Sequence, residues 1–233
     1  MTSNERHANL RLLAEFLVIF AGVVLGLFAD DWRQGRNDAK EGVAALRLVQ
    51  ADLVADSAEV ASRIRVARRD SNATSLLIEV WGDLEASSEY LESAIYSYYV
   101  TSYYQPFNST YEGLKAGNSL RLIEDKELRA GIIDYFQNRQ IYLQQVVDMS
   151  LDADFKTMEK LNQHHIRLSP KDYRWGNLKI QSSLEALYAD EELRNAIAWS
   201  GWIAQWTMRV FRRALDDNAA LRARISQYLI ESD

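Results

Sequence analysis

Residues 12–29 read LLAEFLVIFAGVVLGLFA, and this stretch decides the architecture that we predict. Its only charged residue is Glu15. At about 1.5 Å per residue, a helix of this length measures about 27 Å, which is enough to cross the hydrocarbon core of a bilayer. Trp32 follows two aspartates at the end of the stretch, a position typical of the headgroup level. We therefore predict an N-terminal tail at 1–11, a transmembrane helix at 12–30 and the lipid bilayer as a partner.

Two other interpretations of this stretch remain open. A cleaved signal peptide needs small residues at both key positions before the cleavage point, and Leu27-Phe28-Ala29 offers only one. Glu15 inside the apolar region also argues against a signal peptide. A buried helix of a soluble protein is the other alternative, on length alone.

The apolar stretch has two unlike faces. Because successive residues of a helix lie about 100° apart, Glu15, Ile19, Gly22, Gly26 and Ala29 share one face. Most bulky residues lie on the opposite face, namely Phe16, Leu17, Phe20, Val24, Leu27 and Phe28. The Gly22-to-Gly26 spacing is a GxxxG motif, which lets two helix backbones approach closely. We predict that this face joins copies of the chain into a homo-oligomer.

Glu15 has three interpretations, because an isolated carboxylate in lipid is costly. Its side chain extends to the bilayer interface, or it lies in a helix–helix contact of the homo-oligomer, or it lines a pore. In the last case Glu15 and Asp30 would form two acidic rings that favour cations.

The rest of the chain, 31–233, is predicted to be one helical soluble domain, so the fold class is all-α with a bundle of long helices. Only 2 prolines and 10 glycines occur in 233 residues, so few positions break a helix. Apolar residues recur at helical spacing from Trp32 to about Trp81, which predicts one helix continuous with the membrane helix, or two with a break near 70–72. A second helix is expected at 87–100.

Capping signals predict the later helices. Ser109 to Glu112 reads as a capping box that opens a short helix closed by Gly117-Asn118, and Asp125 caps a long helix that ends near His165. A short strand within 173–180 is an option. Ser183 is expected to cap a short helix. The acids from Asp190 are expected to open a last long helix that runs to 219, is interrupted there and continues to 229.

Three groups of side chains are ambiguous. Trp199, Trp202 and Trp206 share a helix face and are expected to pack in the core, the alternative being a membrane-surface or partner contact. A basic group is expected to form a solvated face, the alternative being a headgroup or nucleic-acid site. A tyrosine-rich group is expected to pack between helices, the alternative being a ligand pocket. These two groups are Arg63, Arg65, Arg68 and Arg69, and Tyr90, Tyr96, Tyr98, Tyr99, Tyr103 and Tyr104.

The composition argues against several classes of function. A net charge of -6 does not fit a nucleic-acid binder, and the absence of cysteine excludes thiolate chemistry and disulfides. His164 and His165 point about 100° apart on a helix and chelate one metal poorly, so we read them as helix-end residues. No catalytic, cofactor-binding or metal-binding residue can be nominated, so we expect no cofactor and no enzyme activity.

The distribution of Lys and Arg bears on the orientation. Arg6 and Arg11 precede the span, and four basic residues follow it within about 20 positions, which favours a cytoplasmic soluble domain on a bacterial inner membrane. The four are Arg33, Arg36, Lys40 and Arg47.

Three segments carry a resemblance to a known family. They are EFLVIFAG at 15–22 with ADDW at 29–32, PFNSTYEGLKAGNSLRLIEDKEL at 106–128, and DEELRN at 190–195. The chain resembles a widespread bacterial family of single-span membrane proteins catalogued as a domain of unknown function. It departs from the family pattern where Asp30 or Asp31 replaces a usual asparagine, and where Phe107 replaces another. The resemblance implies the same architecture and supplies no activity.

Three hypotheses for function follow. The first is a membrane-anchored homo-oligomeric scaffold or interaction protein, which would recruit an unknown protein partner. The second is a homo-oligomeric ion-conducting pore, and the third is a ligand-sensing helical domain.

Overall fold

The computed structural model describes residues 3–168 and 178–232, and over these residues the protein is an all-α assembly of long helices with one small hairpin. The α-helices are α1 (Ser3–Glu79), α2 (Ser88–Tyr96), α3 (Ser109–Ala116), α4 (Lys126–Ile133), α5 (Gln140–His164), α6 (Leu184–Tyr188) and α7 (Glu191–Ser232). The shorter elements are the 3-10 helices η1 (Ser97–Tyr99) and η2 (Ser119–Leu122), the π-helical η3 (Asp134–Arg139), and the strands β1 (Ile166–Leu168) and β2 (Leu178–Ile180).

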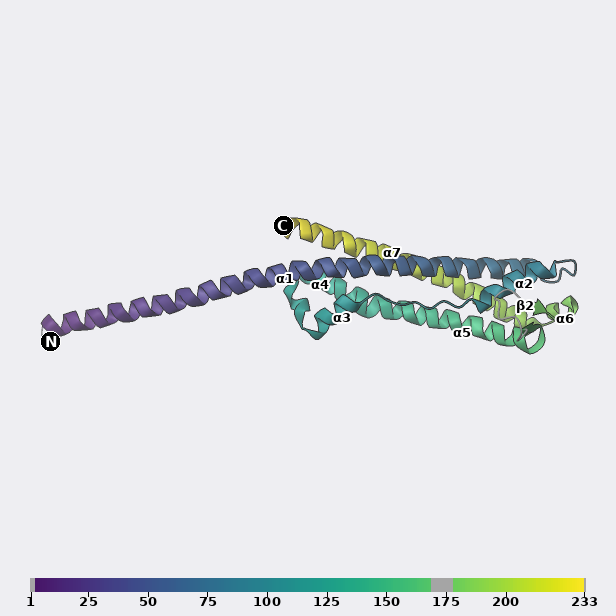
Figure 1. The fold of residues 1–233 in the computed structure, drawn as a ribbon, viewed down its shortest axis with the longest axis horizontal. Helices are drawn as coiled ribbons and strands as arrows, with labels where there is room; N and C mark the ends of the chain where they lie inside the picture. Colours follow the sequence, from purple (N-terminus) through teal and green to yellow (C-terminus); the bar gives the residue numbers. More distant parts are fainter. Residues whose placement is uncertain (1–2, 169–177, 233) are drawn as a thin grey trace.

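The bundle is built around the C-terminal half of α1. Figure 1 shows α5 and α7 lying along this half, while the N-terminal half projects away from the bundle on its own. The C-terminal end of α7 lies where α1 enters the bundle, and there the Gln50 amide donates to the Ser226 hydroxyl (2.7 Å). Among the helices of the described residues, we find none that is both long and apolar enough to cross a bilayer.

The helix α1 is continuous over 77 residues, or about 115 Å at 1.5 Å per residue. The break allowed near 70–72 does not occur. Asp70 and Ser71 are buried at that point, and Arg69 donates to the Asp70 carboxylate at 2.7 Å. Tertiary packing therefore holds helical geometry through residues of modest helix propensity.

Three apolar clusters fill the bundle along its length. The cluster near the entry of α1 includes Leu46, Tyr111 and Ile132, and the middle one joins Val60, Leu143 and Phe211. The cluster at the far end includes Leu77, Leu91, Ile95, Leu161 and Ile197. Each draws on helices far apart in sequence, so a one-sided apolar row on each helix becomes a shared core.

Two of the predicted caps are confirmed and one is wrong. The Asp125 carboxylate accepts from the backbone N–H groups of Glu127 and Leu128, and the Ser183 hydroxyl accepts from that of Ala186. Ser109, in contrast, is the first residue of α3 and makes no capping bond. The carboxylate of Asp52 on α1 accepts from the Thr110 N–H instead (2.8 Å), so the cap comes from 58 residues away.

The two later long helices are also continuous. The helix predicted from Asp125 to near His165 is confirmed as α4, η3 and α5 in unbroken succession, with a π-helical segment at 134–139. The interruption expected after 219 is absent, because α7 runs to Ser232 with Leu221 and Ile225 in the core.

The strand allowed within 173–180 is present as β2, which pairs antiparallel with β1, Ile166 opposite Ile180. Residues 173–177 of that range lie outside the described residues.

Glycine allows α1 to approach its neighbours at two points. A β-carbon added at Gly201 of α7 would overlap the Thr74 side chain, and one added at Gly42 would overlap the carbonyl of Leu122. Gly201 therefore sets the spacing between α1 and α7, the two helices that share the longest interface.

Candidate functional site

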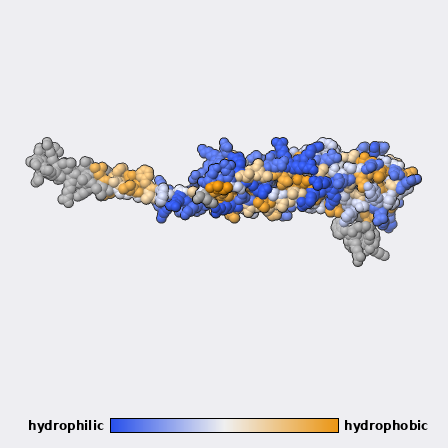
Figure 2. Space-filling model, turned by 90° about the horizontal axis from the view of Figure 1, so that it is seen from above, coloured by the Kyte–Doolittle hydropathy of each residue, from blue (hydrophilic) through white to orange (hydrophobic). Residues whose placement is uncertain are grey.

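The projecting part of α1 exposes large apolar side chains all around the helix. Each of these residues is between 54% and 69% exposed, and they are Leu17, Ile19, Phe20, Val23, Leu25, Leu27, Phe28 and Trp32. Figure 2 shows this apolar segment beside the strongly hydrophilic surface where the bundle begins. Soluble proteins rarely expose a continuous apolar surface of this extent, so this segment is a candidate contact site for lipid or protein.

The predicted oligomer face lies within this segment. Ile19, Gly22, Gly26 and Ala29 are exposed, and a β-carbon added at either glycine would meet no described atom within 4 Å. Space for a second helix is therefore open on this face. The side chain of Glu15 lies outside the described residues, and both its role and the oligomer remain predictions.

Asp30 and Trp32, the other two predicted site residues, make local contacts. Arg33 pairs with the Asp30 carboxylate at 2.8 Å, and the Arg36 guanidinium lies over the Trp32 ring at 5.7 Å. Both members of the ion pair are well exposed, so the pair contributes at most about 1 kcal/mol to stability. A ring of Asp30 carboxylates would also carry a ring of Arg33 cations, which reduces its preference for cations.

A buried polar network surrounds Asp56 on α1. The hydroxyls of Tyr104 (2.9 Å) and Tyr135 (2.5 Å) donate to its carboxylate, and the Tyr135 hydroxyl accepts from the Asn218 amide (2.9 Å). Asp56 and Asn218 are fully buried. Burial raises the pKa of Asp56 above its ordinary value, an effect that these donors oppose. The network joins α1, the segment after η1, η3 and α7, so its first role is to fix their register.

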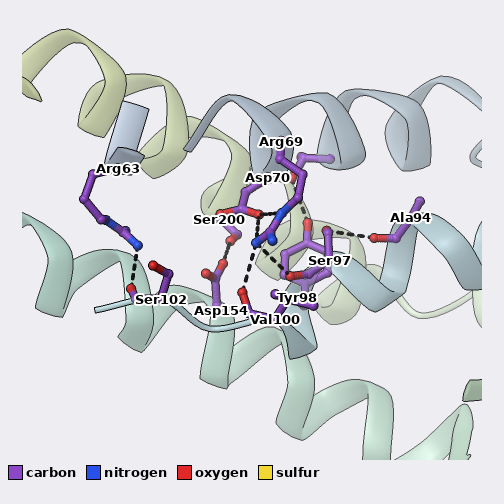
Figure 3. A network of polar contacts seen from close by, with 11 residues as sticks. Arg63, Arg69, Asp70, Ala94, Ser97, Tyr98, Val100, Ser102, Asp154 and Ser200 are labelled. Carbon is purple, nitrogen blue, oxygen red and sulfur yellow. Dashed lines mark hydrogen bonds and ion pairs between the residues drawn. The ribbon is translucent and has the colours of Figure 1, made fainter. Parts of the chain in front are cut away.

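A second network lies further along the bundle (Figure 3). Arg69 donates to the Asp70 carboxylate and to the Val100 carbonyl (2.9 Å), and Arg63 donates to the Ser102 carbonyl. The interpretation of the arginine group as a solvated face is therefore wrong for Arg63 and Arg69, which turn inward.

Asp154 of α5 belongs to the same region. It accepts a hydrogen bond from Ser200 of α7. Burial is the main reason that the pKa of Asp154 rises to about 7, and the nearby Asp70 raises it further, while Ser200, Arg63 and Arg69 lower it. The carboxyl group therefore titrates near neutral pH in a region that holds α1, α5 and α7 together.

The tryptophans of α7 differ from the core packing that we predicted. Trp199 and Trp202 are about half exposed and stack on each other at 5.2 Å, and Trp206 stacks on Trp202 at 6.3 Å. Only Trp206 packs against a core cluster. The two exposed rings border shallow surface grooves on either side of α7, one shared with α1 and one with α5.

Among the tyrosine group and the histidines, buried and exposed side chains both occur. Tyr98 and Tyr104 are buried in the core, as expected for helix packing, whereas Tyr103 is exposed. The prediction for His165 missed a contact. Its ring nitrogens contact Ser182 and Asp190, both at 3.0 Å, which fixes the hairpin to the start of α7. Within the described part of the chain, no group of histidines and acids is arranged to hold a metal ion.

Comparison of the chain with family models, curated proteins and solved structures found no match. The family resemblance described above therefore stays a prediction, and function has to be argued from the molecule itself.

Proposed function

We propose that this protein is a membrane-anchored, homo-oligomeric helical scaffold or interaction protein without catalytic activity. Residues 12–30 would form the anchor in a bacterial inner membrane, as the resemblance to single-span membrane proteins implies. Residues 31–233 would form the helical domain, on the cytoplasmic side. The observation that carries the proposal is the apolar surface of the projecting part of α1, which no described part of the bundle covers.

The spacing along α1 supports an anchor. Trp32 closes the apolar stretch, and Gly42 is the first described residue of α1 that is buried against the bundle. At about 1.5 Å per residue the two are about 15 Å apart, which leaves room for lipid headgroups below the bundle. The contact of Arg36 with the Trp32 ring suits this boundary, where an aromatic ring and a cation both find favourable surroundings.

The open space around Gly22 and Gly26 supports self-association. In lipid there is no hydrophobic force to join helices, so close backbone contact becomes important. A second copy held in the same orientation by its own anchor would present the same two glycines at the same depth.

A role without catalysis is supported by how the polar core is used. The buried carboxylates of Asp56 and Asp154 accept hydrogen bonds from core side chains, which aligns helices. The two grooves beside α7 are shallow, which supports a surface that contacts proteins more than a ligand-sensing pocket. The pairing of Asp30 with Arg33 weakens the pore alternative.

The test is the mass of the full-length protein in nanodiscs, for wild type, Gly22→Leu and Val24→Leu. We expect an oligomer for wild type, a subunit dissociation constant raised about tenfold or more by Gly22→Leu, and no change for Val24→Leu, which lies on the opposite face. A wild-type monomer, or equal effects of the two variants, would contradict the proposed face.

A further inference from the structure

Beyond Trp32, α1 carries its charges on two separate sides. With residues about 100° apart, the exposed basic residues Lys40, Arg47, Arg65 and Arg68 lie within an arc of about 100°. The acids of the same stretch lie on the other side of the helix, at Asp38, Glu41, Asp52, Asp56 and Glu59. Gly22 lies in the same arc and Gly26 about 40° beyond its edge, so the glycine face and the basic residues lie on the same side of α1.

Apolar residues occupy the middle of the basic side. Val54 is 49% exposed, and Ala51 and Ala58 are exposed beside it. We name the combined surface the basic face of α1: Lys40 and Arg47 at one end, Ala51, Val54 and Ala58 in the middle, and Arg65 and Arg68 at the other end.

Several charges of this face are not used within the bundle. Across residues 3–168 and 178–232, Lys40, Arg65 and Arg68 form no ion pair. Their neighbours Arg63 and Arg69 turn inward to backbone carbonyls and to Asp70. Arg63 and Arg69 are therefore hydrogen-bonded within the bundle, whereas Arg65 and Arg68 face solvent.

We infer that the basic face of α1 binds an acidic amphipathic helix of another protein. The apolar middle would pack against an apolar stripe on that helix, and the alanines allow the two backbones to lie close together. Carboxylates near both ends of the partner helix would pair with Lys40 and Arg47 at one end and with Arg65 and Arg68 at the other. The distance from Arg47 to Arg65 is about 27 Å at 1.5 Å per residue, so the partner helix needs about five turns.

Charge selects this occupant over a second copy of the chain. Two anchored copies are parallel, so identical basic residues would lie opposite each other along the face, and like charges in such positions are destabilising. Copies joined at Gly22 and Gly26 would therefore diverge beyond the membrane and leave each basic face open. A nucleic acid or acidic polysaccharide offers charge but no apolar stripe to pack against Val54 and the alanines.

The inference specifies what kind of partner the proposed interaction protein would bind. It depends only on the part of α1 that lies in the bundle. A failure of the Gly22→Leu experiment would leave it standing, and its own failure would leave the anchor and the assembly standing.

The probe is a labelled synthetic 21-residue helical peptide with leucines and alanines on one side and glutamates toward both ends. Its binding to the full-length protein in detergent is followed by fluorescence anisotropy. We expect saturable binding that weakens with salt, and at least about tenfold weaker binding to Arg65→Glu/Arg68→Glu and to Val54→Asp. The matched control is Arg167→Glu/Arg194→Glu, two exposed arginines on β1 and at the start of α7, which should bind the peptide as wild type does.

Two comparisons decide the result. A scrambled peptide of the same composition should bind at least about tenfold more weakly, because its apolar and acidic residues no longer share sides of a helix. Equal binding of the scrambled peptide, or of poly-glutamate or single-stranded DNA, would assign the face to anions in general and overturn the inference. Equal loss in both double charge-reversal variants would also overturn it. Circular dichroism of each variant checks that the bundle remains folded.

Discussion

The two halves of α1 share one backbone conformation and have opposite surroundings. From Leu17 to Trp32 the helix carries apolar side chains on all sides and exposes them. From Gly42 onward it buries residues such as Leu46, Val49 and Leu53 and exposes charged residues such as Arg65 and Arg68. An α-helix satisfies its own backbone hydrogen bonds both in water and in an apolar environment. The side chains therefore determine which of the two environments suits each half. The contrast predicts that substitutions in the bundle half change folding stability and that those in the projecting half change membrane attachment.

The largest effect on folding is expected at Asp56. Asp56→Ala would leave the buried hydroxyls of Tyr104 and Tyr135 without their acceptor, which should lower the free energy of unfolding by about 3 to 5 kcal/mol. Urea unfolding followed by circular dichroism measures the loss. The control is Asp31→Ala in the projecting half, with an expected change below about 0.5 kcal/mol. Equal effects of the two changes would mean that the network does not stabilise the bundle.

A pH-dependent effect is expected at Asp154. Its folded pKa of about 7 lies above the ordinary value of 3.8, so the folded protein keeps a proton that the unfolded chain releases between about pH 4 and pH 7. Stability should therefore fall as the pH rises through this window, by about 2 to 4 kcal/mol from this group. Asp154→Asn keeps an acceptor for Ser200 and should flatten this part of the profile. Unfolding curves at several pH values measure both slopes, and parallel profiles would rule out Asp154 as the source.

A smaller effect is expected at the contact of α1 with α7. Gly201→Ala would push a methyl group into Thr74, whose hydroxyl is held to Tyr98 at 2.7 Å, and should cost about 1 to 3 kcal/mol. Gly113→Ala in α3 is the matched control, because its added methyl meets no described atom within 4 Å. That control should stabilise the protein by up to about 1 kcal/mol through helix propensity. Thermal unfolding compares the two, and the same sign for both would contradict the close approach.

The smallest effect on folding is expected in the projecting half. Leu25→Asp should change the free energy of unfolding of the bundle by less than about 0.5 kcal/mol, because Leu25 is 68% exposed. The same variant should be released from membranes by alkaline carbonate, since a carboxylate near the centre of a span costs about 3 kcal/mol. Retention equal to wild type would contradict the anchor, and Leu48→Asp in the bundle half serves as the control that stays attached.

Sequence reasoning succeeded where the cause is local. The caps at Asp125 and Ser183 were predictable because each side chain reaches an N–H group three or fewer residues away. It failed at Ser109, where the cap comes from Asp52, and it left two alternatives near 70–72, of which the structure has the continuous helix because burial sustains it. It also failed for Trp199 and Trp202, because helical periodicity places residues on a common face but does not say whether another helix covers that face.

The sequence by itself determined that the chain is helical, with an apolar stretch at one end of a long first helix. Scarce proline and helical apolar spacing are enough for that, since both act within a few turns. Only the tertiary structure decided which charges are buried. Arg63 turns inward to Ser102 and Asp154 meets Ser200, while Arg65 and Arg68 stay at the surface. The physical reason is that burial depends on groups brought together from distant segments, and local spacing carries no information about them.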